Sequence, residues 1–188
     1  MKKIGILGGT FDPPHIGHMI IANEVYDALK LDEVWFIPTN EPPHKDKATS
    51  SAADRLEMLQ LAVEGNDNFF VNDIEVKRTG KSYSIDTIKQ LKAAHGDAQF
   101  YFIIGADNIE YLPHWYKIDE LIELVQFVGV RRTAFTTETN YPVTLVDVPF
   151  IDVSSSFIRT RIQEGKTVAY WVTENVYAYI KEHQLYAK

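Results

Sequence analysis

The 188-residue chain has no cysteine, which excludes thiol catalysis, disulfide bonds and thiolate metal sites. It has no apolar run near the roughly 20 residues that span a membrane. The apolar run in MKKIGILGG is too short for a secretory signal before Gly8 interrupts it, so we expect a cytoplasmic protein. Positive charge is scarce as well. A net charge of −7 argues against a generic nucleic-acid-binding protein, which would carry a basic face.

The remaining composition is that of a folded globular protein. Hydrophobic residues make up 45% of the chain and charged residues 24%, which excludes disorder as its main state. The length suits one domain spanning residues 1–188. Strand-like and helix-like segments alternate along it, with no internal repeat and no linker. The alternation predicts an α/β fold, with a mostly parallel sheet and helices on both faces.

The stretch GGTFDPPHIGH, residues 8–18, directly follows the apolar run IGIL. Gly8 and Gly9 allow backbone conformations that a side chain would hinder, and Pro13 and Pro14 delay a helix until the chain has passed them. The stretch therefore predicts a strand, a glycine-rich turn and a helix start. Backbone N–H groups and the helix dipole make such a place suitable for an anion.

Two histidines lie in this stretch, at a spacing that puts them side by side at the helix start. His15 and His18 are three residues apart and bracket Gly17. The stretch fits neither a Walker A loop, which needs a lysine, nor the G-x-G-x-x-G spacing of a dinucleotide loop. The pair favours phosphate binding over a merely solvated connection.

Further segments are predicted to lie at the same edge of the sheet. NEPPHK follows the second strand, GADN and then HWYK follow a nearly continuous apolar strand, and SSSFIR follows the last strand. Ligands of open parallel sheets bind beyond the carboxyl ends of the strands, near the switch in strand order. The convergence of these segments predicts one binding site.

Together these segments resemble a known family. GGTFDPPHIGH with SSSFIR resembles the paired signature of nucleotidyltransferases that carry an H-x-G-H motif. PPHK, GKSYSIDT, GADN and WYK resemble the bacterial nicotinate-nucleotide adenylyltransferases, from residue 3 to about residue 185. The resemblance implies a single Rossmann-like, doubly wound domain whose C-terminal helices carry SSSFIR. It also implies adenylyl transfer from ATP to nicotinate mononucleotide, which gives deamido-NAD and pyrophosphate in NAD biosynthesis.

The resemblance implies a role for individual residues. The residues expected to be catalytic are His15, His18, Lys45 and Arg159. The residues expected to bind ATP are Gly8, Gly9, Thr10, Phe11, His15, His18, Gly105, Asp107, Ser155, Ser156 and Arg159. The residues expected to bind nicotinate mononucleotide are Lys45, Tyr83, Ser84, Asp107, Trp115 and Tyr116. No metal ligands are expected, since Mg²⁺ arrives with ATP and is held mainly by phosphates and water.

Recognition of the pyridine ring depends on a few of these residues. Trp115 would stack on the ring, and Asp107 would accept hydrogen bonds from a ribose diol. Ser84 is expected to cap a helix, so that its hydroxyl and nearby N–H groups receive the ring carboxylate. Arg131 and Arg132 fall where the family often has a basic pair before Pro-Gly, which is absent here, and their role stays open.

Alternatives remain at this stage. The acceptor could be nicotinamide mononucleotide or pantetheine phosphate, or the chain could be a non-catalytic ATP-binding module. Retention of both histidines, Lys45 and Arg159 argues against a lapsed enzyme. The expected partners are ATP and nicotinate mononucleotide, without nucleic acid or membrane, and a homodimer is left open.

Overall fold

The structure is a computed structural model that describes residues 1–40, 48–78, 80, 82–132, 139–149 and 151–187. Within this part, six strands pair in parallel in the order β3-β2-β1-β4-β5-β6. The strands are β1 (Lys3–Gly9), β2 (Glu33–Pro38), β3 (Phe69–Val71), β4 (Gln99–Gly105), β5 (Gln126–Arg132) and β6 (Val143–Val148). This order is that of doubly wound, dinucleotide-binding sheets, and the predicted fold class is confirmed.

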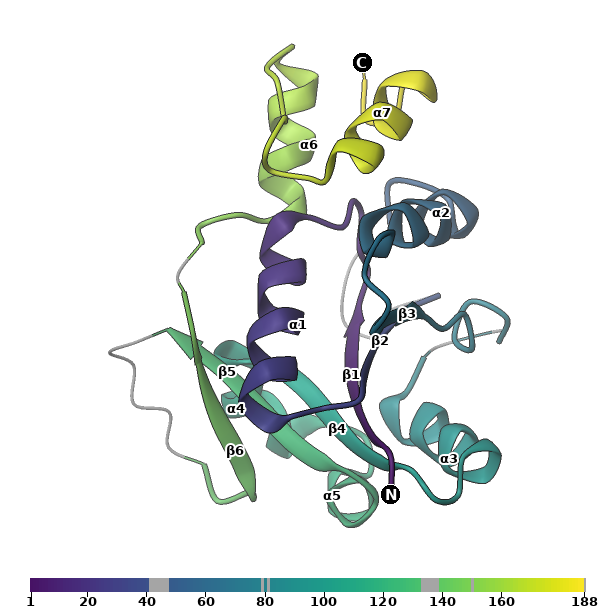
Figure 1. The fold of residues 1–188 in the computed structure, drawn as a ribbon, viewed down its shortest axis with the longest axis vertical. Helices are drawn as coiled ribbons and strands as arrows, with labels where there is room; N and C mark the ends of the chain where they lie inside the picture. The colour runs from purple at the N-terminus through teal and green to yellow at the C-terminus, as the bar shows by residue number, and fades with distance from the viewer. Residues whose placement is uncertain (41–47, 79, 81, 133–138, 150, 188) are drawn as a thin grey trace.

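Helices cover both faces of this sheet (Figure 1). They are α1 (Ile16–Leu29), α2 (Ala52–Val63), α3 (Ser84–Ala94), α4 (Ala106–Tyr111), α5 (Ile118–Leu124), α6 (Ser155–Gln163) and α7 (Glu174–Glu182), with a 3₁₀ turn η1 (Leu112–His114). Alternate strand residues face opposite sides, since strand side chains have a period of two. Ile4 and Ile6 of β1 pack with α3 and α5, whereas Leu7 of β1 and Ile103 of β4 pack on the side of α1 and α2.

The two C-terminal helices form a further layer beyond the carboxyl end of β1 (Figure 1). Their buried side chains pack with Met58 of α2 and include Ile158, Val176 and Ile180. SSSFIR lies at the start of α6, so it faces the carboxyl end of the sheet. No helix in the described ranges is long and apolar enough to cross a bilayer.

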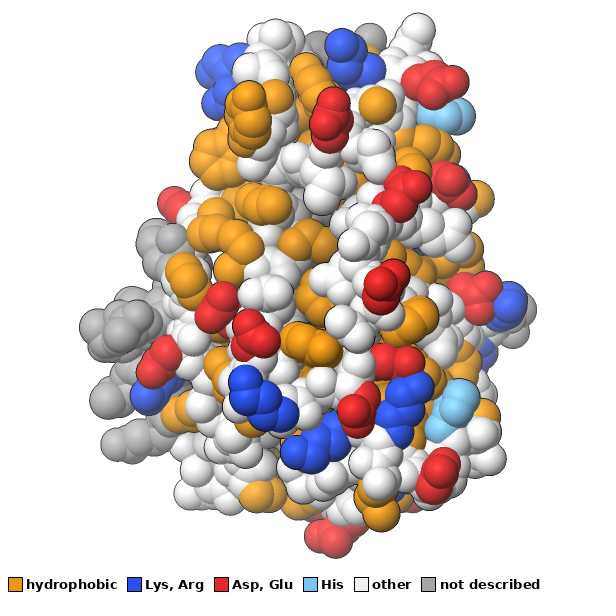
Figure 2. All heavy atoms as spheres, viewed as in Figure 1, with side chains coloured by type: hydrophobic (Ala, Val, Ile, Leu, Met, Phe, Trp, Pro, Cys, Tyr) orange, Lys and Arg blue, Asp and Glu red, His pale blue; other side chains and the backbone are white. Residues whose placement is uncertain are grey.

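Acidic and basic side chains are interspersed on the face that Figure 2 shows, and no basic stripe runs across it. This face agrees with the net charge of −7.

Two local expectations were wrong, and one short helix was not predicted. The apolar-rich segment FFVNDIEV, residues 69–76, predicts one strand, but β3 ends at Val71. The chain turns after Asn72, whose N–H still donates to Phe36 O (2.9 Å). GADN opens the short helix α4, which the sequence does not predict. Ser84 is the first helical residue of α3 and not its cap; Tyr83, in extended conformation, takes the cap position.

Candidate active site

The GGTFDPPHIGH stretch forms the turn between β1 and α1, at the point where β1 and β4 meet and the strand order reverses. Phe11 adopts a left-handed φ of 52° in this turn. A side chain at Gly17 would place its Cβ 2.9 Å from Val153 Cγ1 and 3.1 Å from His15 Nδ1. The glycine between the histidines therefore allows α1 to begin directly against the segment that leads into α6.

The two histidine rings of the turn are stacked, with centroids 3.6 Å apart and an interplanar angle of 23°. The backbone N–H of His15 donates to His18 Nδ1 (3.1 Å), so a neutral His18 carries its proton on Nε2. Burial lowers the pKa of His15 to about 4, which keeps its ring neutral at pH 7. Its Nδ1 is buried without a hydrogen-bond partner among the described residues.

The start of α6 is joined to this turn by side-chain hydrogen bonds. Ser154 caps the helix by accepting from Phe157 N (3.1 Å). Ser155 Oγ donates to Pro13 O (2.8 Å), and Arg159 Nη1 donates to Asp12 O (2.7 Å). Residues more than 140 positions apart in sequence thus form one wall.

This wall encloses what we call the polar cleft. Nine of the residues expected to bind ATP line it: Gly8, Gly9, Thr10, Phe11, His15, His18, Ser155, Ser156 and Arg159. Hydroxyl groups, imidazoles, a guanidinium and the N-terminus of α6 suit the oxygens of a polyanion. Ser155 was expected to bind ATP, but its hydroxyl donates its proton to Pro13 O in this structure.

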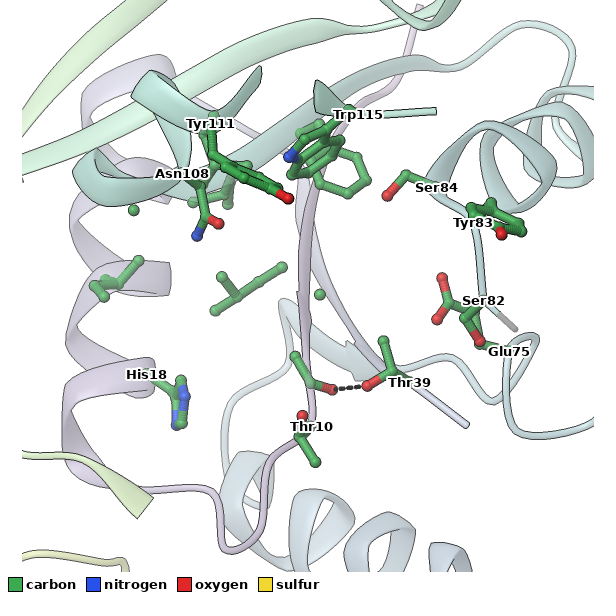
Figure 3. Close-up of a pocket in the computed structure, with 18 of the residues that line it drawn as sticks. Thr10, His18, Thr39, Glu75, Ser82, Tyr83, Ser84, Asn108, Tyr111 and Trp115 are labelled. Carbon is green, nitrogen blue, oxygen red and sulfur yellow. Dashed lines mark hydrogen bonds between the residues drawn. The ribbon is translucent and has the colours of Figure 1, made fainter. Parts of the chain in front are cut away.

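A second cavity of about 380 Å³, the aromatic cleft, lies beside the first (Figure 3). Its size falls within the roughly 300–1,000 Å³ of small-molecule sites. Five of the expected substrate residues line this cleft and not the polar cleft: Tyr83, Ser84, Gly105, Trp115 and Tyr116. Gly105, expected at ATP, therefore lies with the residues expected at the pyridine nucleotide.

The tryptophan of this cleft is held by packing. Trp115 makes edge contacts with Phe102 (centroids 5.7 Å apart) and Phe127 (6.0 Å). In Figure 3, Trp115 and Tyr111 lie at one end of the cleft, Ser84 faces it from α3, and His18 lies toward the other end. A flat ring could enter between these groups.

The two clefts meet at the turn. Gly8, Gly9, Thr10 and His18 line both of them. A ligand with phosphates in the polar cleft and another with a ring in the aromatic cleft would therefore approach each other at these four residues. This shared wall is the central feature of the site.

Sequence reasoning missed a buried polar group beside α3. Glu75 Oε1 accepts from Thr87 Oγ1 (2.7 Å), which in turn accepts from Arg78 Nη2 (2.9 Å). Burial is the main cause that raises the pKa of Glu75. The group fixes the first turn of α3, where Ser84 lies, and Glu75 itself lines the aromatic cleft.

Sequence reasoning also missed Arg55, whose side chain is only 2% exposed. Its Nη1 donates to Thr10 O (2.8 Å) and to Thr39 O (2.7 Å), just beyond β1 and β2. The available signal was an arginine at helical spacing from the apolar Met58 and Leu59, which places it on the buried face of α2.

Some expected residues cannot be placed. Lys45 and the side chains of Asp107 and Arg132 lie outside the described part of the chain. Arg131 Nε donates to Asp147 Oδ1 (2.8 Å) across β5 and β6, which gives it a partner away from the clefts. Within the described residues no group of three or more His, Asp or Glu could hold a metal ion.

The fold and the site together define a class of protein. A phosphate-suited turn at the switch point of a 3-2-1-4-5-6 sheet is typical of nucleotide-binding α/β proteins. A family model described as cytidylyltransferase-like matches residues 6–161.

Closer relatives are found among curated proteins. The chain is 58% identical to a probable nicotinate-nucleotide adenylyltransferase of Geobacillus thermodenitrificans, over 99% of this chain and 87% of the relative. It is 52% identical to the protein of the same name from Oceanobacillus iheyensis, over 99% and 97%. The chain therefore belongs to the cytidylyltransferase-like family and, within it, to that of the nicotinate-nucleotide adenylyltransferases.

A solved structure supports the fold. The nicotinic acid mononucleotide adenylyltransferase of Plasmodium falciparum, complexed with NaAD, superposes with a TM-score of 0.82 at 20% identity, over 99% of this chain and 98% of the other.

Proposed function

We propose that this protein is a nicotinate-nucleotide adenylyltransferase, which transfers the adenylyl group of ATP to nicotinate mononucleotide and releases deamido-NAD and pyrophosphate. The observation that carries the proposal is the meeting of the polar and aromatic clefts at the GGTFDPPHIGH turn. The reaction needs two nucleotides with their phosphates in contact, and proximity of this kind supplies much of the rate. The names of the relatives at 52–58% identity agree with it.

The chemical step is a direct displacement. A phosphate oxygen of nicotinate mononucleotide attacks the α-phosphorus of ATP, and the bond from that phosphorus to the bridging oxygen breaks. The electron pair leaves with pyrophosphate. Because the nucleophile is already an anion, no side-chain base and no covalent enzyme intermediate is needed.

The histidines and Arg159 stabilise the charge that moves in this step. His18 lies at the shared wall, so its Nε2–H is placed to donate to the α-phosphate. His15 is neutral and donates or accepts without adding charge. Arg159, anchored on Asp12 O, binds the β- and γ-phosphates that leave. Lys45 is assigned the same task on the strength of the resemblance alone.

Magnesium is written here as part of the substrate, MgATP. Mg²⁺ prefers phosphate oxygens and water, with few protein ligands. The polar cleft fits this preference, since the one carboxylate among its described lining residues, Asp12, already accepts from Thr49 and Ser50 backbone N–H groups. Bound to ATP, the metal would neutralise the developing charge on pyrophosphate.

The aromatic cleft is assigned to nicotinate mononucleotide. Trp115 stacks on the pyridine ring, and Tyr83 and Tyr116 close one side with their rings 4.8 Å apart. Ser84 and the start of α3 receive the ring carboxylate. The N–H groups of Asp86 and Thr87 already donate to Tyr83 O, which leaves those of Ser84 and Ile85 without an intrahelical acceptor.

We propose that residues 1–188 form one domain that acts in the cytoplasm without nucleic acid or membrane. The oligomeric state, which the sequence leaves open, would be determined by light scattering on the purified protein.

The decisive experiment is a turnover assay with MgATP and each of three acceptors: nicotinate mononucleotide, nicotinamide mononucleotide and pantetheine phosphate. We expect pyrophosphate release with the first at the highest kcat/KM. Preference for pantetheine phosphate, or ATP binding without turnover, would overturn the proposal.

A further inference from the structure

A buried hydrogen-bond cluster joins the C-terminal end of the chain to the GGTFDPPHIGH turn. The Asp12 carboxylate, whose residue is 3% exposed, accepts from Tyr186 Oη (2.7 Å) across 174 positions of sequence. It also accepts from Thr49 N (2.6 Å) and from the Ser50 hydroxyl. One carboxylate therefore connects the turn, the segment before α2 and the end of the chain.

The phenol is committed to donating in this cluster. Tyr186 is 7% exposed, and its burial raises the pKa of the phenol far above its ordinary value. It therefore keeps its proton at neutral pH. The Asp12 carboxylate then meets an O–H donor in addition to the N–H donors of Thr49 and Ser50.

The same aspartate holds the proposed ATP-binding arginine. Asp12 O accepts from Arg159 Nη1 (2.7 Å), and the next carbonyl, of Pro13, accepts from Ser155 Oγ (2.8 Å). Rotation or displacement of Asp12 would therefore move the guanidinium and the start of α6. Displacements of about 1 Å in a site of this kind can lower the rate about 100-fold.

We infer that Tyr186 is a positioning residue for adenylyl transfer: its hydroxyl holds Asp12, and through Asp12 it sets the position of Arg159 in the polar cleft. This inference rests on the proposed function. Tyr186 lines neither cleft, so it acts through Asp12 and not on the substrates. The aromatic cleft does not include Asp12 or Arg159, so the effect concerns ATP and not nicotinate mononucleotide.

The chain offers a matched control. Tyr179 Oη donates to Asp54 Oδ1 (3.0 Å), and this bond joins α7 to α2 in the same C-terminal layer. It is a tyrosine–aspartate bond like that of Tyr186, but neither Tyr179 nor Asp54 lines a cleft. Both Tyr179→Phe and Tyr186→Phe remove one hydroxyl and keep the ring that packs in the layer.

The test is steady-state kinetics and thermal melting of the wild type and both variants. For Tyr186→Phe we expect kcat/KM for MgATP to fall about tenfold, with KM for nicotinate mononucleotide within about twofold. Tyr179→Phe should keep wild-type kinetics whatever its melting temperature. Wild-type kinetics for Tyr186→Phe, or equal losses in both variants, would overturn the inference.

A double-mutant cycle separates positioning from general weakening. In an Arg159→Lys background, Tyr186→Phe should lower kcat/KM for MgATP by a clearly smaller factor than in the wild type, because the guanidinium that Tyr186 positions has been replaced. Equal losses in both backgrounds would show that Tyr186 does not act through Arg159. An inactive wild type would instead contradict the proposed function, which keeps the two failures distinct.

Discussion

The imidazole rings of His15 and His18 lie one on the other, 3.6 Å between centroids, and His15 N donates to His18 Nδ1. This relationship gives the two rings different environments. His15 is 8% exposed and its pKa is lowered by burial, whereas His18 lines both clefts. The histidine at the shared wall is therefore the one that we expect to act on the reacting phosphate.

His18→Ala is expected to lower kcat by about 100-fold or more, since loss of one preorganised donor to a transition-state oxyanion costs this much. His18→Asn should lose nearly as much. Its side-chain oxygen can still accept from His15 N, but it has no donor at the position of Nε2. Kinetics and circular dichroism of both variants check this. Near-normal kcat in His18→Asn would show that the ring serves only to cap α1.

Stability should depend on pH through His15. Its pKa is lowered from 6.5 to about 4, so the folded state binds this proton less readily than the unfolded state. The contribution of neutral His15 to the free energy of unfolding is therefore complete above pH 6.5, and it is lost as the pH falls toward about 4. The shift corresponds to at most about 3 kcal/mol. Urea unfolding at pH 7, 6 and 5, without ligand, should show a steeper loss for the wild type than for His15→Gln. Parallel curves would contradict the prediction.

Arg159→Ala should impair the use of ATP. The guanidinium is the cation that lines the described polar cleft, and we expect kcat/KM for MgATP to fall about 100-fold. KM for nicotinate mononucleotide should change by less than about threefold. Arg161→Ala, two residues further along α6, is the control, because its Nε donates to Thr167 O (3.0 Å). A change confined to KM for nicotinate mononucleotide would contradict the assignment of Arg159 to the phosphates of ATP.

Arg55→Met should lower the free energy of unfolding. The change leaves the part-buried carbonyls of Thr10 and Thr39 without the donor that Arg55 supplies, and we expect the free energy of unfolding to fall by about 3 kcal/mol. Arg131→Met removes an ion pair of which Asp147 is half exposed, and it should cost less than about 1 kcal/mol. Urea unfolding compares the two. Similar losses would mean that the Arg55 hydrogen bonds contribute little.

The sheet could be predicted from the sequence because its strands are apolar runs with local signals, and each binding segment follows a strand. α4 was missed, since it has only six residues and starts directly at the end of β4 without a side-chain cap. Asp12, Arg55 and Tyr186 were missed for another reason. Their partners lie from 16 to 174 positions away, and a single sequence does not reveal which distant polar groups meet inside a fold.

The expected roles at the start of α3 were likewise only partly readable. Tyr83 rather than Ser84 occupies the N-cap position of this helix, and the hydrogen bonds of Glu75 and Arg78 to Thr87 hold its first turn. No feature of SYSIDT indicates that the carboxylate of Glu75, nine positions before Ser84, lies against this helix start. The placement of Ser84 in the cleft follows from that packing.

The last prediction concerns the substituent on the pyridine ring: nicotinate mononucleotide should be preferred over its amide by at least roughly tenfold in kcat/KM. Ser84 and the helix start offer donors and a positive dipole end, all of which a carboxylate can accept. An amide would turn its NH₂ toward a donor, at a cost of about 1–3 kcal/mol. Ser84→Thr keeps the hydroxyl and should keep the preference, whereas Ser84→Ala should narrow it. Equal kcat/KM for acid and amide at saturating MgATP in the wild type would refute the assignment. An unchanged ratio of the two kcat/KM values in Ser84→Ala would show that the backbone N–H groups alone discriminate between acid and amide.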